Sequence, residues 1–361
     1  MTSGGIASQG NDDSECLMRD IMKKILLASS ALVMAASAAA ASERVAATVN
    51  GYFHAGVGYT DSDFIGGAAS GIQDITLMRD GEIHFNFRGT SDNGLTFVGR
   101  VELEAAGNTG AGNWSDRSWA GIRGAFGAVE VGNIRHASYD MATGPLFVGG
   151  AHIGHYDAFN RSGPGATNNR FGRPVGLFYN TPVFSGFQGR VSYHPDATAQ
   201  RAGGTQTVGA DDVISVGLNY RFAGDGFAVQ LSGGYDHISG SGRGFGGPNA
   251  TGDEDAWTAG IRGEFAGFVV GGLFKERLLA TDSTDWLVNA TYGTGPWIFG
   301  LGYVYSDFGR AAANGDRDRY AGWVSYALSP GVTVQAGVEH TDERSGGPSG
   351  TAALAWMTLT F

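Results

Sequence analysis

Cysteine and lysine are almost absent from the sequence. Cys16 is the single cysteine in 361 residues, and Lys275 is the only lysine after Lys24. The chain therefore has no disulfide framework, and a thiol nucleophile is excluded once the leader that contains Cys16 is removed. Nearly all remaining cationic side chains are arginines, which keep their charge at any working pH.

Long apolar runs are also missing after residue 41, and no 3.6-residue period is sustained there, which excludes membrane-spanning helices. The one strongly apolar segment, 25–36, follows two lysines and runs into small residues that end at Ala41. This arrangement predicts a secretory signal peptide over residues 22–41, because a spanning helix would need about 20 apolar residues. We interpret residues 1–21 as an over-extended start without function.

Acidic residues outnumber basic ones, and the formal net charge is −11. Removal of the leader, which carries four acidic and three basic residues, leaves −10. This balance argues against nucleic acid as a partner. The segment 42–361 contains no recognisable interdomain linker, so we expect one large architecture. The whole chain has 61 glycines but only 9 prolines and no collagen-like repeat, which suits a β-protein rich in turns.

The recurring pattern is an alternation of period two. In the stretch 82–88, isoleucine and phenylalanines alternate with Glu, His, Asn and Arg, and similar alternation returns in 214–222 and 297–305. Such a pattern is typical of strands with one apolar and one polar face. It fits a transmembrane barrel, although a soluble secreted β-sandwich array would also alternate.

Sixteen such segments follow one another, and an even count is what an antiparallel bacterial barrel requires. Short turns, such as 91–94 and 224–226, alternate with long connections. We therefore predict a 16-stranded antiparallel transmembrane β-barrel with short periplasmic turns and long outer loops. The expected strands are 45–59, 77–90, 95–105, 117–126, 128–136, 174–180, 187–195, 212–222, 226–237, 255–265, 267–277, 285–293, 296–306, 319–328, 332–340 and 351–361.

Aromatic residues cluster at the ends of the expected strands. Trp257 and Phe265 bracket one strand, and Trp286 and Tyr292 bracket another. Aromatic rings favour the two membrane interfaces of a barrel. The chain also ends on Phe361 at the close of an alternating strand. We expect this residue to act in assembly, where the last strand pairs with the first.

The glycine-punctuated hairpin 117–133 and the long segment 137–173 after it resemble the Gram-negative general (diffusion) porins. The resemblance covers the chain from Met22 onward, and its pattern is closest to the Rhodobacter-type porins. It implies that 137–173 folds into the lumen as a constriction loop. It also implies homotrimers in the outer membrane, in contact with lipid and lipopolysaccharide, that pass ions and small hydrophilic solutes by diffusion.

Charged side chains at strand centres should point into the lumen, because an arginine on the lipid face costs about 2–4 kcal/mol at the midplane. This rule turns Arg190, Arg221 and Arg262 inward together with the arginines of the second to fourth strands. We predict a constriction in which basic wall residues oppose loop carboxylates, with further acids beside them; the alternative is simple solvated lumen charge. The candidate residues are Arg88, Arg100, Arg123, Asp140, Asp157, Glu82 and Glu102, with Glu104 nearby.

Motifs for other chemistry are weak. The letters of a GxGxxG motif occur in 242–247 without a βαβ context, and His152 and His155 near Asp157 lack a third histidine. We therefore expect no cofactor. Resemblance to the family allows structural Ca²⁺ at outer-loop acids as an alternative to solvated carboxylates. The candidates are Asp253, Asp255, Asp316 and Asp318.

Three functional classes remain in view. A passive channel fits the strand number, because sixteen strands leave an aqueous lumen. A substrate-selective channel is the main alternative, and the sequence does not identify a solute, an exclusion size or an ion preference. A barrel enzyme or adhesin is a third possibility, but Ser-His-Asp, HExxH and GxSxG signatures are absent.

Overall fold

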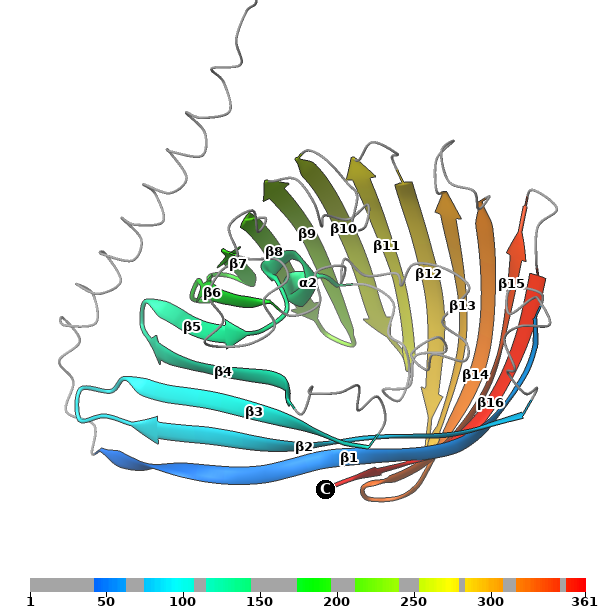
Figure 1. The fold of residues 1–361 in the computed structure, drawn as a ribbon, viewed down its shortest axis with the longest axis horizontal. Helices are drawn as coiled ribbons and strands as arrows, with labels where there is room; N and C mark the ends of the chain where they lie inside the picture. The colour runs from blue at the N-terminus through cyan, green and yellow to red at the C-terminus, as the bar shows by residue number, and fades with distance from the viewer. Residues whose placement is uncertain are drawn as a thin grey trace, which may run out of the picture.

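The computed structural model describes residues 42–62, 75–106, 115–143, 174–195, 212–239, 253–278, 283–307, 316–344 and 349–361. Sixteen strands close into one barrel with a short helix inside it (Figure 1). No helix in these ranges has the length and apolarity to span a membrane. The elements are β1 (Glu43–Ser62), β2 (Ile75–Thr90), β3 (Thr96–Ala106), β4 (Ser115–Gly124), β5 (Gly127–Asn133), α2 (Ala137–Met141), β6 (Val175–Asn180), β7 (Phe187–His194), β8 (Asp212–Gly224), β9 (Phe227–Ser239), β10 (Glu254–Phe265), β11 (Phe268–Leu278), β12 (Ser283–Thr294), β13 (Trp297–Asp307), β14 (Arg317–Ser329), β15 (Val332–Glu343) and β16 (Ser349–Thr360).

Each strand pairs antiparallel with its sequence neighbours, and β1 closes the barrel against β16. The closure reaches the last residue, because Gly51 and Phe361 exchange backbone N–H···O hydrogen bonds of 3.0 and 3.2 Å. The Phe361 ring also lies over Gly51, where a Cβ would meet its Cζ at 2.8 Å. The predicted 16-stranded antiparallel barrel is confirmed.

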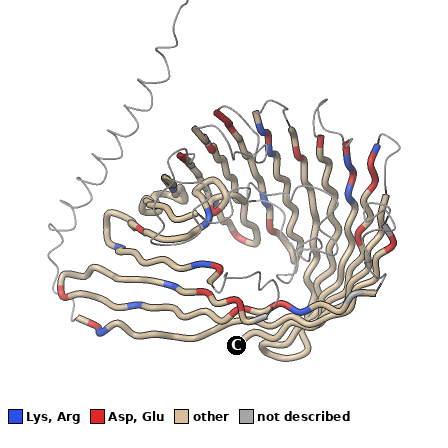
Figure 2. Tube along the Cα trace, in the orientation of Figure 1, with Lys and Arg blue, Asp and Glu red and all other residues tan. Residues whose placement is uncertain are grey.

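Alternation along the strands separates an outer apolar face from an inner polar one. In β12, Trp286 and Val288 are each 52% exposed, whereas Asp285 and Leu287 are each 3% exposed. The buried positions face the interior of the closed barrel, and the exposed apolar positions form its outer surface. Figure 2 shows acidic residues at the ends of several strands and on β2–β4.

Aromatic rings on the outer surface form contacts near both ends of the strands. Near the short turns, Phe268 packs against Phe265 and Tyr292 with ring centroids 5.7 and 4.6 Å apart. Near the other end, Trp257 packs on Tyr235 at 4.4 Å and Trp286 on Phe274 at 4.5 Å. The two rows are typical of barrels whose aromatic girdles lie at the membrane interfaces.

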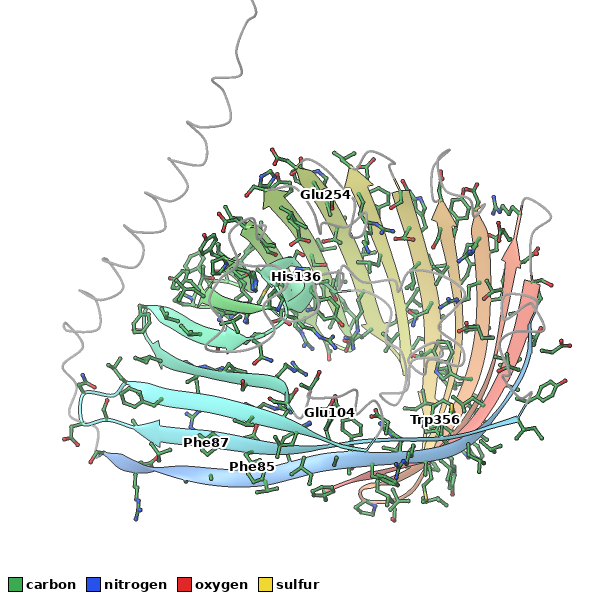
Figure 3. The ribbon with its side chains drawn as sticks, in the orientation of Figure 1. Phe85, Phe87, Glu104, His136, Glu254 and Trp356 are labelled. Carbon is green, nitrogen blue, oxygen red and sulfur yellow. The ribbon has the colours of Figure 1, made fainter. Side chains whose placement is uncertain are left out.

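Three consecutive strands are shorter than the rest. β5, β6 and β7 have 7, 6 and 8 residues. The fifth strand was predicted over 128–136 but ends at Asn133, because the chain then leaves the wall and enters the lumen. There His136 is fully buried in the barrel interior (Figure 3).

Candidate pore constriction

The segment 134–143, which we call the neck, crosses from β5 to the inner wall formed by β7–β10. Three of its backbone N–H groups have no strand to pair with and donate hydrogen bonds to serine hydroxyls on the wall instead. The three pairs are Ala137 to Ser192 at 3.0 Å, Ser138 to Ser215 at 2.8 Å and Thr143 to Ser232 at 2.7 Å. The short helix α2 is thereby held against strands β7–β9.

One carboxylate on the inner wall binds two side chains of the neck. Asp236 of β9 is 0% exposed and accepts the Ser138 hydroxyl at 2.8 and 2.6 Å. Nδ1 of His136, which is also 0% exposed, lies 3.1 Å from Oδ1 of Asp236. A buried carboxylate requires such partners, because removing it from water without them would be costly.

Glycines on the wall make room for the neck. A Cβ on Gly260 would overlap the carbonyl oxygen of Thr143, and a Cβ on Gly234 would lie 2.6 Å from Cβ of Ser138. The neck therefore lies directly on the backbone of β9 and β10. Any side chain at these two positions would lift it away.

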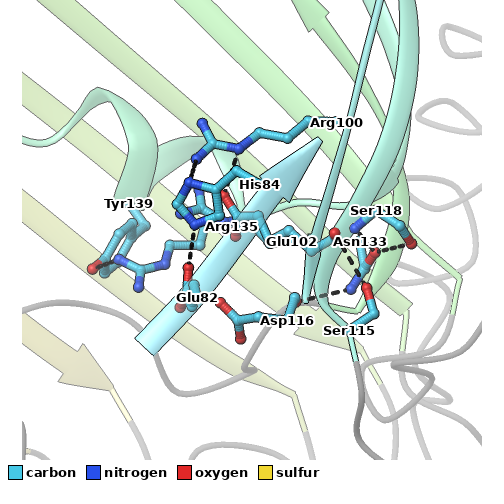
Figure 4. A network of polar contacts seen from close by, with 11 residues as sticks. Glu82, His84, Arg100, Glu102, Ser115, Asp116, Ser118, Asn133, Arg135 and Tyr139 are labelled. Carbon is cyan, nitrogen blue, oxygen red and sulfur yellow. Dashed lines mark hydrogen bonds and ion pairs between the residues drawn. The ribbon is translucent and has the colours of Figure 1, made fainter. Parts of the chain in front are cut away.

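A second polar cluster, which we call the wall network, lies on the inner faces of β2–β4 (Figure 4). Glu102 is 0% exposed and lies between two guanidinium groups, with Nε of Arg100 at 2.8 Å and Nε of Arg117 at 2.6 Å. Arg100 also contacts Nδ1 of His84 at 2.6 Å, and Nε2 of His84 lies 2.6 Å from Glu82. Since a guanidinium only donates, this Nδ1 accepts and Nε2 carries the proton shared with Glu82.

A third group of charges connects the wall to α2 through Glu130 of β5. Glu130 pairs with Arg123 at 3.0 Å and with Arg190 at 3.2 Å, and Arg190 lies 3.4 Å from Asp140 on α2. Burial raises the pKa of Asp140 above its ordinary value, and the nearby guanidinium groups of Arg190 and Arg117 reduce this shift. Desolvation outweighs the ion pair at this carboxyl.

The sequence-predicted residues fall into three places. Glu82, Arg100 and Glu102 are brought together in the wall network, and Glu104 lies on the inner side of β3 (Figure 3). Arg123 joins Glu130 instead, one residue from the end of β4. The remaining candidates are more scattered: Arg88 is exposed two residues from the end of β2, Asp140 lies on α2, and Asp157 lies outside the described residues with most of 137–173.

Sequence reasoning missed several of the residues that build this region. Arg117 shares the inner face of β4 with Arg123, so the same alternation could have found it. Glu130 lies between Val129 and Val131 and carries a similar signal, whereas Asp236 lies between Tyr235 and His237 and carries a weaker one. Arg135 and His136 belong to an irregular segment, where no periodicity identifies which way a side chain points.

Metal-ligating side chains gather in the wall network. One ligand atom from each of Glu82, His84 and Glu102 lies within 4.8 Å of the others, and the same holds for Glu82 with Glu104 and Asp116. In the first group, Arg100 already contacts both His84 and Glu102 and supplies the compensating positive charge. The second group is an acidic cluster on the inner wall.

The outer acids singled out for Ca²⁺ have protein partners where the structure describes them. Asp255 accepts from the Tyr235 hydroxyl at 2.5 Å and lies 2.8 Å from His237. In the other pair, Asp316 accepts from a tyrosine hydroxyl at 2.9 Å and Asp318 is bound by Arg344. Residues 152–157 and 242–247 lie outside the described ranges.

Comparisons with known proteins agree with this architecture. Residues 28–346 match the Gram-negative porin family. The major outer membrane protein P.IB of Neisseria gonorrhoeae is 31% identical over 196 residues, 52% of this chain and 51% of that protein. The chain thus spans about half the length of the curated relatives it matches.

Solved structures share the fold at lower identity. A porin refined at 1.8 Å superposes with a TM-score of 0.64 at 18% identity, covering 88% of this chain and 100% of that one. The anion-selective porin from Comamonas acidovorans gives 0.61 at 18% identity, with the same coverage. Family match, closed barrel and aromatic rows agree, and the chain is a 16-stranded outer-membrane β-barrel that belongs to the Gram-negative porin family.

Proposed function

We propose that the protein is a passive channel for ions and small hydrophilic solutes. The observation that carries this proposal is a closed barrel of sixteen strands whose inner face is polar and whose neck narrows the lumen from one side. A barrel of this size encloses an aqueous channel. Passage then follows concentration gradients and requires neither catalysis nor a cofactor.

Liposome swelling with sugars of graded size tests the channel directly. Rates that fall smoothly with solute size support diffusion, whereas fast passage of one sugar among several of equal size would support a substrate-selective channel. Liposomes that do not swell with any solute, although the protein is inserted, would contradict both. A barrel enzyme or adhesin would then be the better hypothesis.

The constriction is proposed to lie between the wall network and the neck. Arg88, Arg100 and Arg123 with Glu82 and Glu102 would supply the wall charges, and Asp140 with Asp157 would supply the loop carboxylates. Replacing both aspartates by Asn should shift selectivity toward anions, and replacing the three arginines by Gln should shift it toward cations. Reversal potentials under a salt gradient measure both changes, and unchanged ratios in both variants would place the constriction elsewhere.

A homotrimer is supported by the short strands β5–β7. Strands of 6–8 residues fall below the about 9–11 that cross a bilayer, so this part of the outer surface suits another copy better than lipid. Val131 on β5 and Val288 on β12 are both 52% exposed on the outer face. Val131→Gln should reduce the trimer fraction in detergent, measured by native mass, whereas Val288→Gln should leave it unchanged; a wild-type monomer would contradict the proposal.

The remaining outer surface is proposed to contact lipid, and lipopolysaccharide in the outer leaflet, through its aromatic rows. Structural Ca²⁺ at Asp253, Asp255, Asp316 or Asp318 is a secondary proposal. The ion would have to compete with bonds such as that between Asp318 and Arg344. A calcium titration that leaves the melting temperature unchanged would remove it.

A further inference from the structure

Most described arginines of the inner wall lie within ion-pair distance of a carboxylate, which compensates part of their charge. Arg100 and Arg117 share Glu102, and Arg123 and Arg190 share Glu130. A charge in a close pair acts on a passing ion mainly as a dipole, so much of its field cancels. A guanidinium without such a partner acts as a full charge.

Arg135 in the neck is such a guanidinium. In the described part of the chain, no carboxylate lies within ion-pair distance of it, and its Nε is buried without a hydrogen-bond partner. Its contacts are with one aromatic residue: NH1 donates to the Tyr139 hydroxyl, and Cζ lies 4.3 Å from the centroid of the Tyr139 ring. The stacked ring fixes the guanidinium plane, and among the described residues no carboxylate compensates its charge at ion-pair distance.

Arg135 lies where its charge can act on ions in the lumen. Figure 4 shows Arg135 and Tyr139 beside the wall network, on the side that carries Glu82 and His84. Burial lowers the pKa of Arg135, and the Arg117 guanidinium lowers it further. The side chain still keeps its proton at working pH, because arginine ionises far above that range. Partial burial also reduces screening by water and salt compared with an exposed arginine such as Arg88.

We propose that Arg135 is the main residue by which the lumen admits anions, and that a carboxylate or phosphate oxygen of a passing solute contacts the accessible part of its guanidinium group. The inference rests on the proposed channel function. The sequence pattern predicted basic residues on the wall, at Arg88, Arg100 and Arg123, and acidic residues on the loop. The proposal instead places the most influential positive charge in the neck. The acids Glu82, Glu102 and Asp140 attract the same guanidinium at longer range, so the solute contact is transient and compatible with permeation.

Arg135→Gln tests the proposal in planar bilayers under a KCl gradient. We expect the ratio of chloride to potassium permeability to fall by about threefold to tenfold, and by less in Arg88→Gln and Arg123→Gln. Arg344→Gln is the matched control, because Arg344 also lies over a tyrosine ring, Tyr305 at 4.5 Å, but at the outer end of the barrel. It should leave the ratio unchanged. A fall in Arg135→Gln no larger than in Arg88→Gln would overturn the inference.

A cysteine variant makes the test independent of folding yield. Cys16 is the only natural cysteine and lies in the predicted leader, so Arg135→Cys should carry the single thiol of the exported channel. An open channel is measured before and after reaction with thiosulfonates that add an ammonium or a sulfonate group. The ammonium should restore anion passage and the sulfonate should reduce it further; equal ratios after both reagents, with labelling verified by mass, would contradict the assignment. If the wild-type protein does not conduct at all, the channel function fails, whereas a conducting channel insensitive to position 135 refutes only this inference.

Discussion

Two regions of the inner wall on opposite sides of the neck use different chemistry. On β7–β10 the neck is bound by buried serine hydroxyls, by close packing on glycines and by one buried carboxylate, Asp236. On the opposite side, around β2–β4, the lumen is lined by ion pairs whose arginines are about 30% exposed, such as Arg100 and Arg117.

This difference suggests that one region fixes the position of the neck and the other sets the ion selectivity of the pore. Short, buried hydrogen bonds define one geometry, since leaving any of their donors unpaired would be costly. Partly exposed ion pairs contribute little to stability but place charge along the path of the solute. Changes on the β7–β10 side should therefore alter pore size, and changes on the β2–β4 side should alter ion preference.

Asp236→Ala should have the largest effect. It leaves His136 and Ser138 without their common partner, and breaking a buried pair of this kind costs about 3–5 kcal/mol. We expect the neck to detach and single-channel conductance to rise. Asp236→Asn keeps an oxygen acceptor for Ser138 and should give a smaller rise; equal conductance in wild type and Asp236→Ala would show that the neck is held by other contacts.

Gly260→Val tests the packing of the neck without removing a charge. The new side chain would overlap the Thr143 carbonyl, so the last residues of the neck should leave the wall and conductance should increase. Gly263→Val in the same strand is the control, because a Cβ there meets nothing within 4 Å. If both variants conduct alike, the contact between Gly260 and Thr143 has no role in pore size.

Glu102→Gln tests the opposite side. It removes the carboxylate shared by Arg100 and Arg117 with little change in shape, so the net positive charge of this group rises by one. We expect a severalfold shift toward anions at nearly constant conductance, from a change of about 1–4 kcal/mol in the local interaction with an ion. A large conductance change with constant selectivity would show that the β2–β4 side sets pore size and not ion preference.

Asp140 links the two regions and should give the smallest effect, one that depends on pH. Because burial raises the pKa of Asp140, this carboxyl gains its proton at higher pH than exposed carboxyls as the solution is acidified. The negative charge beside Arg190 is then lost as the pH falls, and selectivity should move toward anions. Asp140→Asn should remove the early part of this shift in reversal potentials measured from pH 7 downward; an identical pH profile in the variant would contradict it.

The strand pattern could be predicted because it depends on local alternation. The stretch 82–88 identifies its lipid and lumen faces by itself, since the cost of an arginine in lipid leaves one orientation for Arg88. The end of β5 was predicted less well. Residues 134–136 continue an extended pattern, and the contact of His136 with Asp236, 100 residues later in the sequence, cannot be read from that pattern.

Sequence alone determined the barrel, its sixteen strands, the orientation of their faces and the role of the last strand in closure, because period two and turn spacing are properties of neighbouring residues. Tertiary structure decided which charges pair. Glu102 lies between Arg100 and Arg117 only because β3 and β4 adopt one register, and Arg190 reaches Asp140 only because the neck crosses the lumen. The net charge at any point of the pore depends on such contacts between residues far apart in the sequence, so Arg135 could be distinguished from the other arginines only in the folded barrel.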